Sequence, residues 1–283
     1  MMPVDEFVEV ADGVRLRVRC WSGRLGPPFL LVHGLSSYAL LWDEVAVRLN
    51  AAGYAAYAVD LRSHGESDSP PDGYDTATAA DDVAAVHAHF GLGPAIAVGQ
   101  SWGGDVVVRL AARHPIAVAA LGLVDGGWTD LSANFDSWAA CERALRPPEV
   151  GEMRPDQLRQ LLRKGHPGWS AQAVEATVAN LRTTVDDHLE RRLPIDRHMR
   201  IVRSMWDEPP LHDYPAISVP ALLLPAIPAG TGGDADRRRA AVARAVGALP
   251  VARVKEYVGA DHDIHAQHPA ELARDLLDVA AGV

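Results

Sequence analysis

Cysteine is scarce in this chain, which has only Cys20 and Cys141 among its 283 residues. Two cysteines cannot form a disulfide framework, and neither belongs to a Cys-x-x-Cys pair that could hold zinc. Residues 1–10 carry acids where a secretory signal needs basic residues followed by an apolar run. These features are typical of a reducing compartment, so we expect a cytoplasmic protein.

Long apolar runs and basic charge are also lacking. The most apolar stretch, residues 220–229, is broken by prolines and is much shorter than the ~20 residues of a membrane span. Lys and Arg number 27 against 37 Asp and Glu, which gives a net charge of −10. Nucleic acids and anionic membranes attract basic surfaces, so we expect neither as a partner. We expect a monomer or homodimer that acts on a small molecule.

Short apolar runs alternate with helical segments along most of the chain. Two strands around residues 11–13 come first, and continuous apolar runs then follow at 29–33, 54–60, 95–100, 118–125, 221–225 and 251–258. Amphipathic helical segments lie among these runs at 42–52, 76–90, 102–114, 234–248 and 269–281. This alternation predicts an α/β fold with a parallel sheet and crossover helices.

Residues 126–212 break the alternation. This segment shows no clear strand, and it contains amphipathic stretches at 131–145, 155–164, 171–181 and 195–206. Its length is too great for an ordinary connection between two strands. We therefore predict a helical cap of residues 126–212, inserted into a core of residues 1–125 and 213–283.

The strongest local motif is Gly99-Gln100-Ser101-Trp102-Gly103, which fits G-x-S-x-G between an apolar strand and a helix. Small flanking residues permit a sharp turn that projects the serine above the sheet. The helix that follows favours negative charge developing at its N-terminus. The alternative is a glycine-rich turn with a solvent-facing serine.

A second motif is His33-Gly34-Leu35, at the end of the run 29–33. The glycine lets the backbone turn, so the amide of Leu35 can point at an oxyanion, with the amide of Trp102 as a second donor. We expect His33 to support this loop structurally.

Three histidines follow the last strand: His262, His265 and His268. His262 lies nearest to the strand, at the edge where parallel sheets carry their sites. Their spacing also permits a metal site, but the glutamate of H-E-x-x-H and an acid or cysteine ligand set are missing. We therefore expect His262 to be a general base and expect no metal.

These motifs together resemble the α/β-hydrolase family, in a serine-nucleophile form with a helical cap. The resemblance covers nearly the whole core, including residues 60–67, which resemble a D-x-R-x-H-G-x-S loop. It implies an eight-stranded, mostly parallel sheet with flanking helices. The spacing of His262 to the proline seven residues later matches the family's ending, whereas Asp261 departs from its usual small residue.

The acid of the implied triad is the least defined member. The family usually carries it after the penultimate strand, here 221–225, where only Asp234 and Asp236 follow, late and near a helix start. Some relatives carry it after the preceding strand, where Asp125 lies. We expect Asp125, with Asp234 or Asp236 as alternatives.

Ser101 stands where dehalogenases and epoxide hydrolases of similar shape carry aspartate, so the resemblance implies an acyl-enzyme. We expect hydrolysis of a carboxylic ester or lactone of an apolar small molecule. Open alternatives are a proline iminopeptidase-like enzyme (although H-G-G-P-G is absent), a C–C bond hydrolase, a haloperoxidase-like enzyme, and a biosynthetic or ligand-binding protein without hydrolysis. No G-x-G-x-x-G or P-loop motif is present, so we expect no cofactor.

Substrate choice is expected to come from the cap. The cap's tryptophans Trp128, Trp138, Trp169 and Trp206 could line an apolar pocket with Trp102, or could simply form the cap's own core. Of these, we expect four to contact the substrate: Trp102, Trp128, Trp138 and Trp206. The cap's histidines and arginines, among them His198 and the pair 191–192, are expected on a solvated face.

Overall fold

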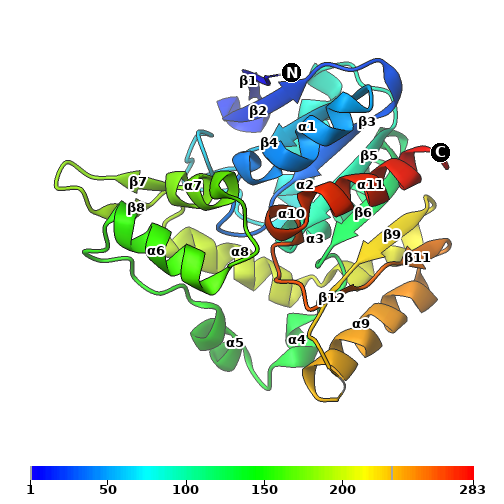
Figure 1. Ribbon diagram of the computed structural model, residues 1–283. Coiled ribbons are helices and arrows are strands. Elements are labelled where there is room, and N and C mark those ends of the chain that lie inside the picture. The colour runs from blue at the N-terminus through cyan, green and yellow to red at the C-terminus, as the bar shows by residue number, and fades with distance from the viewer. Residues whose placement is uncertain (1, 231) are drawn as a thin grey trace.

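The computed structural model describes residues 2–230 and 232–283 and is built around one central sheet (Figure 1). The sheet has eight strands in the order β1-β2-β4-β3-β5-β6-β9-β11. Only β1–β2 and β2–β4 pair antiparallel, and the remaining neighbours are parallel, as the sequence predicts. The strands are β1 (Val4–Glu9), β2 (Arg15–Trp21), β3 (Leu25–Val32), β4 (Tyr54–Val59), β5 (Ala95–Gln100), β6 (Val118–Val124), β9 (Ala221–Leu224) and β11 (Ala252–Val254).

Helices cover both faces of this sheet, since alternate strand residues feed two separate cores. Along β3, Leu30 and Val32 join the core under α2, α3 and α9, whereas Phe29 and Leu31 join the core under α1 and α11. A strand buried on both faces must read as a continuous apolar run. The helices are α1 (Asp43–Ala51), α2 (Thr76–His89), α3 (Trp102–Arg113), α9 (Asp234–Ala248), α10 (Ile264–Gln267) and α11 (Pro269–Ala280).

The run expected as one strand at 251–258 is two short strands. The first is β11, and the second, β12 (Tyr257–Val258), pairs with β10 (Ala226–Ile227) in a separate two-stranded sheet. This second pair carries the chain from the main sheet towards residues 259–263.

The segment between β6 and β9 gathers on one side of the molecule (Figure 1). It contains α4 (Leu131–Asn134), α5 (Trp138–Leu145), α6 (Pro155–Gly165), α7 (Ala171–Ala179), β7 (Leu181–Thr183), β8 (Leu189–Arg191) and α8 (Ile195–Asp207). The expectation that it holds no strand is wrong, because β7 and β8 pair as an antiparallel hairpin. The helix expected at 131–145 is divided, because Ser137 caps a new helix by accepting from the Ala140 amide at 3.2 Å.

Several arginines of this segment bind the core, so the expected solvated face is wrong for them. Arg192 donates to the Gly65 carbonyl at 3.0 Å and lies 2.9 Å from a Glu66 carboxylate oxygen. Arg197 donates to the Ser63 hydroxyl at 3.0 Å. These bonds join α8 and the residues before it to the loop that follows β4.

No helix in the described ranges is long and apolar enough to cross a bilayer.

Asp60, directly after β4, organises that loop. Its Oδ1 accepts from the Ala39 amide at 2.7 Å, and its Oδ2 accepts from the Glu66 amide at 2.9 Å and from Arg17 Nε at 2.7 Å. Asp60 is fully buried and Arg17 is only 6% exposed. Gly65 has a φ of 52° and leaves no room for a Cβ beside the Asp60 carboxylate, so glycine is required there. The aspartate and glycine of the sequence motif therefore form one structural unit.

Replacing Asp60 with alanine is expected to destabilise the protein by about 3–5 kcal/mol, because the buried Arg17 charge would lose its close partner and keep only Asp5, a half-exposed carboxylate at 3.6 Å. Urea unfolding measures this loss. Asp68→Ala is the matched control: Asp68 pairs with Arg15 across side chains that are 37% and 60% exposed, so its loss should cost at most about 1 kcal/mol. Equal losses in the two variants would contradict the role assigned to Asp60.

Candidate active site

Ser101 occupies a sharp turn between β5 and α3. Its φ of 53° and ψ of −124° lie in a region that side chains rarely adopt. Such strain persists only where the surrounding structure enforces it. Here the turn is so tight that a Cβ on Gly99 would lie 2.0 Å from the Gly103 carbonyl oxygen. Gly99 is therefore required by the turn, and Gly103 is required by its contact with β3, because a Cβ there would lie 2.4 Å from the Val32 carbonyl oxygen.

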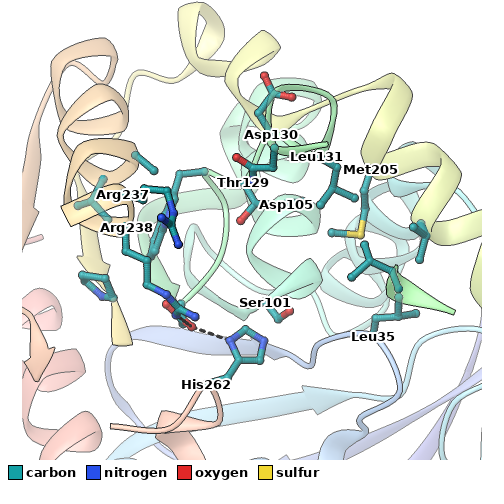
Figure 2. A pocket seen from close by; sticks show the side chains of 18 of the residues that line it. Leu35, Ser101, Asp105, Thr129, Asp130, Leu131, Met205, Arg237, Arg238 and His262 are labelled. Carbon is teal, nitrogen blue, oxygen red and sulfur yellow. Dashed lines mark hydrogen bonds and ion pairs between the residues drawn. The ribbon is translucent and has the colours of Figure 1, made fainter. Parts of the chain in front are cut away.

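His262 and Asp125 are joined by a short hydrogen bond, although 137 residues separate them. Asp125 directly follows β6, the neighbour of β5, and His262 lies beyond β12. His262 Nδ1 donates to Asp125 Oδ2 at 2.6 Å, the bond that the dashed line at His262 marks in Figure 2. The Ala226 amide donates to Asp125 Oδ1 at 3.0 Å. With its proton on Nδ1, neutral His262 keeps Nε2 free to accept another.

Burial and charge act in opposite directions on His262. Burial lowers the pKa of the imidazole, but the hydrogen bond and the negative charge of Asp125 raise it, and the net result is a pKa above its ordinary value. Arg238, whose Nη1 lies 3.5 Å from Asp125 Oδ2, lowers this pKa and so limits the increase.

The two alternative acids, Asp234 and Asp236, make other contacts than Asp125 does. Asp234 accepts from Arg238 Nε at 3.0 Å and from Arg237 Nη2 at 3.3 Å. Asp236 is an exposed residue in the first turn of α9. Of the three candidates, Asp125 is the one that the described residues bring into hydrogen-bond contact with His262.

Ser101 and His262 face the same cavity, which has a volume of about 730 Å³ (Figure 2). Its wall combines the loops after β3, β5 and β6, helix α9, and helices α4 and α8 of the segment between β6 and β9. The apolar part of the wall is formed by Leu35, Trp128, Leu131, Leu145, Val202, Met205, Pro225, Ala241 and Val242. The polar part contains Ser36, Asp105, Thr129, Asp130, Asn134, His198, Asp234, Arg237, Arg238 and Arg244 beside Ser101, Asp125 and His262.

The loop with Leu35 lies directly against Ser101. Gly34 is so close that an added Cβ would lie 2.9 Å from the Ser101 Cβ. His33 is fully buried and supports this loop, because its Nε2 accepts from the Leu61 amide at 3.1 Å and its Nδ1 donates to the Gly34 carbonyl at 2.8 Å. The expected oxyanion donor, the Leu35 amide, therefore belongs to a fixed loop beside the serine.

The expectation that Trp102, Trp128, Trp138 and Trp206 all line the pocket is wrong for three of these four tryptophans. Trp128 lines the cavity. Trp102 is buried and donates from its indole to Thr76 Oγ1 at 3.1 Å, although its backbone amide begins α3 next to Ser101. Trp138 and Trp206 pack edge to face at 5.9 Å within the core of the inserted segment. In the described part of the chain, only Trp128 of these four contributes to the cavity wall.

The remaining histidines also separate in space. His265 is buried against Trp42 at 4.8 Å, and His268 packs against Tyr257 at 5.8 Å. No group of three His, Cys, Asp or Glu side chains with metal-binding geometry occurs within the described ranges. The expected surface position of His198 is wrong, since this residue is 7% exposed and lines the cavity.

Asp105, one turn after Ser101 on α3, is a buried acid that the sequence analysis missed. It is 3% exposed, its Oδ1 accepts from the Gly127 amide at 3.1 Å, and its Oδ2 finds no partner among residues 2–230 and 232–283. Burial raises the pKa of Asp105 to about 8, against smaller lowering effects from the Gly127 amide and Arg109. The Asp105 carboxyl is therefore protonated at neutral pH. The sequence signal that could have revealed it is a lone acid within the apolar pattern of a helix.

Asp105 is expected to make stability depend on pH. Because its pKa is about 8 in the folded protein and ~3.9 when unfolded, the folded state binds the proton more tightly, and stability falls as pH rises between these values. Asp105→Asn removes the ionisation, so it should be more stable than wild type by about 1–3 kcal/mol at pH 9 and should lose this advantage near pH 4. Urea unfolding across this pH range measures the difference.

Asp130→Asn is the matched control for this prediction. Asp130 also lines the cavity, but it caps α4 by accepting from the Ala133 amide at 3.0 Å, a role that asparagine also fills. A pH dependence in Asp105→Asn equal to that of wild type would contradict the assignment.

Comparisons with known proteins agree with this architecture. The chain is 34% identical over 131 residues to the non-heme haloperoxidase of Rhodococcus erythropolis, and the match covers 46% of this chain and 47% of that protein. The chain thus matches about half the length of that relative. It is 31% identical over 241 residues to the N-formylmaleamate deformylase of Pseudomonas putida, over 81% of this chain and 79% of that protein.

The structural comparison and the family model cover most of the chain. The crystal structure of E-2-(acetamidomethylene)succinate hydrolase superposes with a TM-score of 0.78 and 23% identity over 98% of both chains, which shows a shared fold. Residues 27–269 match the family model of the alpha/beta hydrolase fold. The chain therefore belongs to the alpha/beta hydrolase family, as the sequence motifs indicated.

Proposed function

We propose that this protein is a serine hydrolase that cleaves a carboxylic ester or lactone through an acyl-enzyme. Ser101 is the nucleophile, His262 the general base and Asp125 the acid. The observation that carries this proposal is the 2.6 Å hydrogen bond between His262 and Asp125, beside a cavity that both His262 and Ser101 line. A nucleophile, a base and a group that orients the base are the parts that this chemistry needs.

In the proposed mechanism, His262 Nε2 takes the proton of Ser101 as Ser101 Oγ attacks the substrate carbonyl. The amides of Leu35 and Trp102 donate to the oxyanion that develops. The tetrahedral intermediate then collapses: the bond between its carbon and the leaving-group oxygen breaks, and His262 gives its proton to the departing alkoxide. The acyl group remains bound to Ser101 as an ester. His262 then takes a proton from water, whose oxygen attacks that ester, and the acid product leaves as Ser101 regains its proton.

Asp125 has two roles in this scheme. It holds the imidazole with Nδ1 protonated, and its charge stabilises the imidazolium that forms while Ser101 attacks. The pKa of His262, raised by Asp125 against the effect of burial, agrees with these roles. The base is active when neutral, so kcat/KM should rise with pH through this pKa.

The substrate is a small molecule with an apolar part and polar groups. A cavity of about 730 Å³ is within the range of roughly 300–1,000 Å³ that small-molecule sites occupy. Leu131 and Met205 offer apolar contact on one side, and Arg237 with Arg238 offers charged groups on another (Figure 2).

Hydrolysis of an N-acyl amide is a second candidate. The relative that matches over 81% of this chain is named for deformylating N-formylmaleamate. The same serine, base and oxyanion donors serve amides, since His262 can protonate a departing nitrogen as well as an oxygen.

The proposal predicts distinct effects for three substitutions, measured with a fluorophosphonate probe and with p-nitrophenyl butyrate. Ser101→Ala should abolish labelling and lower kcat by about 10⁶-fold. Asp125→Asn should lower kcat by about 10⁴-fold and move the rise of kcat/KM to lower pH, because His262 loses the carboxylate that raises its pKa. Asp234→Asn should change the rate less than tenfold, as expected for the exposed ion pairs of Asp234.

Trp138→Phe is a control for the general effect of mutation, since Trp138 packs on Trp206 and is not among the residues that line the cavity. A larger loss in Asp234→Asn than in Asp125→Asn would identify Asp234 as the acid. A wild-type protein that neither reacts with the probe nor hydrolyses esters or N-formyl amides would contradict the hydrolase proposal and favour ligand binding or cyclisation.

A further inference from the structure

A second serine and histidine pair lines the same cavity. Ser36 Oγ and His198 Nδ1 lie 3.1 Å apart, although Ser36 follows β3 and His198 belongs to α8. Both residues line the cavity that contains Ser101, and Ser36 is exposed whereas His198 is 7% exposed. The mechanism described above uses neither of them.

The hydrogen bonds of His198 fix where its proton lies. His198 Nε2 lies 3.2 Å from the Leu145 carbonyl oxygen, which can only accept, so Nε2 must carry the hydrogen. Burial lowers the pKa of His198, so the ring is neutral at neutral pH and Nδ1 is an acceptor. The Ser36 hydroxyl must therefore donate to Nδ1. The oxygen of Ser36 keeps its lone pairs and presents an acceptor without a donor.

Ser36 lies close to the reacting centre. A Cβ on Gly34 would lie 2.9 Å from the Ser101 Cβ, and Ser36 is two residues further along, a span of at most about 7 Å. The Ser37 amide donates to the Gly34 carbonyl at 3.1 Å, which closes a turn around Leu35 and Ser36. Ser36 has a φ of 61°, in the left-handed region that residues other than glycine, asparagine and aspartate rarely adopt. Such strain is found most often at binding sites and active sites.

We propose that Ser36, held by His198, is a specificity-determining residue whose oxygen accepts a hydrogen bond from a hydroxyl or amide N–H of the substrate, beside the carbonyl that Ser101 attacks. This inference rests on the function proposed above. Ser36 would favour substrates that carry a hydrogen-bond donor a few bonds from the reacting carbonyl over substrates that carry only an acceptor at that place.

The test compares p-nitrophenyl 3-hydroxybutyrate with p-nitrophenyl 3-methoxybutyrate. The second ester has the same oxygen but carries a methyl group in place of the donor hydrogen. Wild type should have a kcat/KM about tenfold higher for the hydroxy ester, the effect of one hydrogen bond. Ser36→Ala and Ser36→Gly should bring this ratio close to one. Ser132→Ala is the matched control, since Ser132 is an exposed serine on α4 that binds Asp130.

Ser36→Gly separates binding from a structural role. Glycine relieves the positive φ, so this variant should be at least as stable as Ser36→Ala in thermal unfolding and should still lose the preference. If the Ser36–His198 bond served only to attach α8 to the core, both variants would lose stability and keep the wild-type ratio, which would overturn the inference. Equal rates of wild type on the two esters would overturn it as well.

The proposed hydrolase function is tested separately by fluorophosphonate labelling of Ser101. Labelled wild type that shows no preference between the two esters disproves the subsite and leaves the hydrolase proposal intact. Wild type that is neither labelled nor active on either ester disproves both.

Discussion

The candidate site depends on how closely the backbone approaches itself around Ser101. A Cβ on Gly103 would lie 2.4 Å from the Val32 carbonyl oxygen, and one on Gly126 would lie 2.0 Å from the Ser101 carbonyl oxygen. These contacts join the ends of β3, β5 and β6, which are adjacent strands of the sheet. Because no side chain separates them, the loop with Leu35, the serine and the residue after β6 converge on one cavity. Any larger residue at these glycines would separate the parts of the site.

The core of the fold could be predicted from the sequence because burial on both faces leaves a plain signal. The strand at 95–100 and the helix at 234–248 were predicted with the bounds that the structure has. The sequence also predicted that an aspartate following one of these strands would lie near His262, since parallel strands end at one edge and few polar residues follow them there. The choice between Asp125 and Asp234 needed the structure, because both follow strands and only distance separates them.

The segment between β6 and β9 was harder to predict, since its helices and strands are short and are stabilised by contacts with residues distant in sequence. Strands of three residues such as β7 and β8 have no periodicity to detect, and they form because they pair with each other. Trp128 and Trp138 are chemically equal in sequence, yet one lines the cavity and the other packs on Trp206. The burial of His198 likewise follows from where α8 packs, which no local pattern encodes.

Charge around His262 is set by a chain of contacts that includes the acid first considered as an alternative. Asp125 raises the pKa of His262, whereas Arg238, 3.5 Å from the same carboxylate oxygen, lowers it. Asp234 holds Arg238 through Nε at 3.0 Å. Asp234 thus binds the arginine that lowers the pKa of His262. Asp125 is 8% exposed and Arg238 is 43% exposed, so dissolved salt screens the arginine more strongly than the aspartate. The basicity of His262 therefore depends most on the buried partner, and the exposed pair adjusts it.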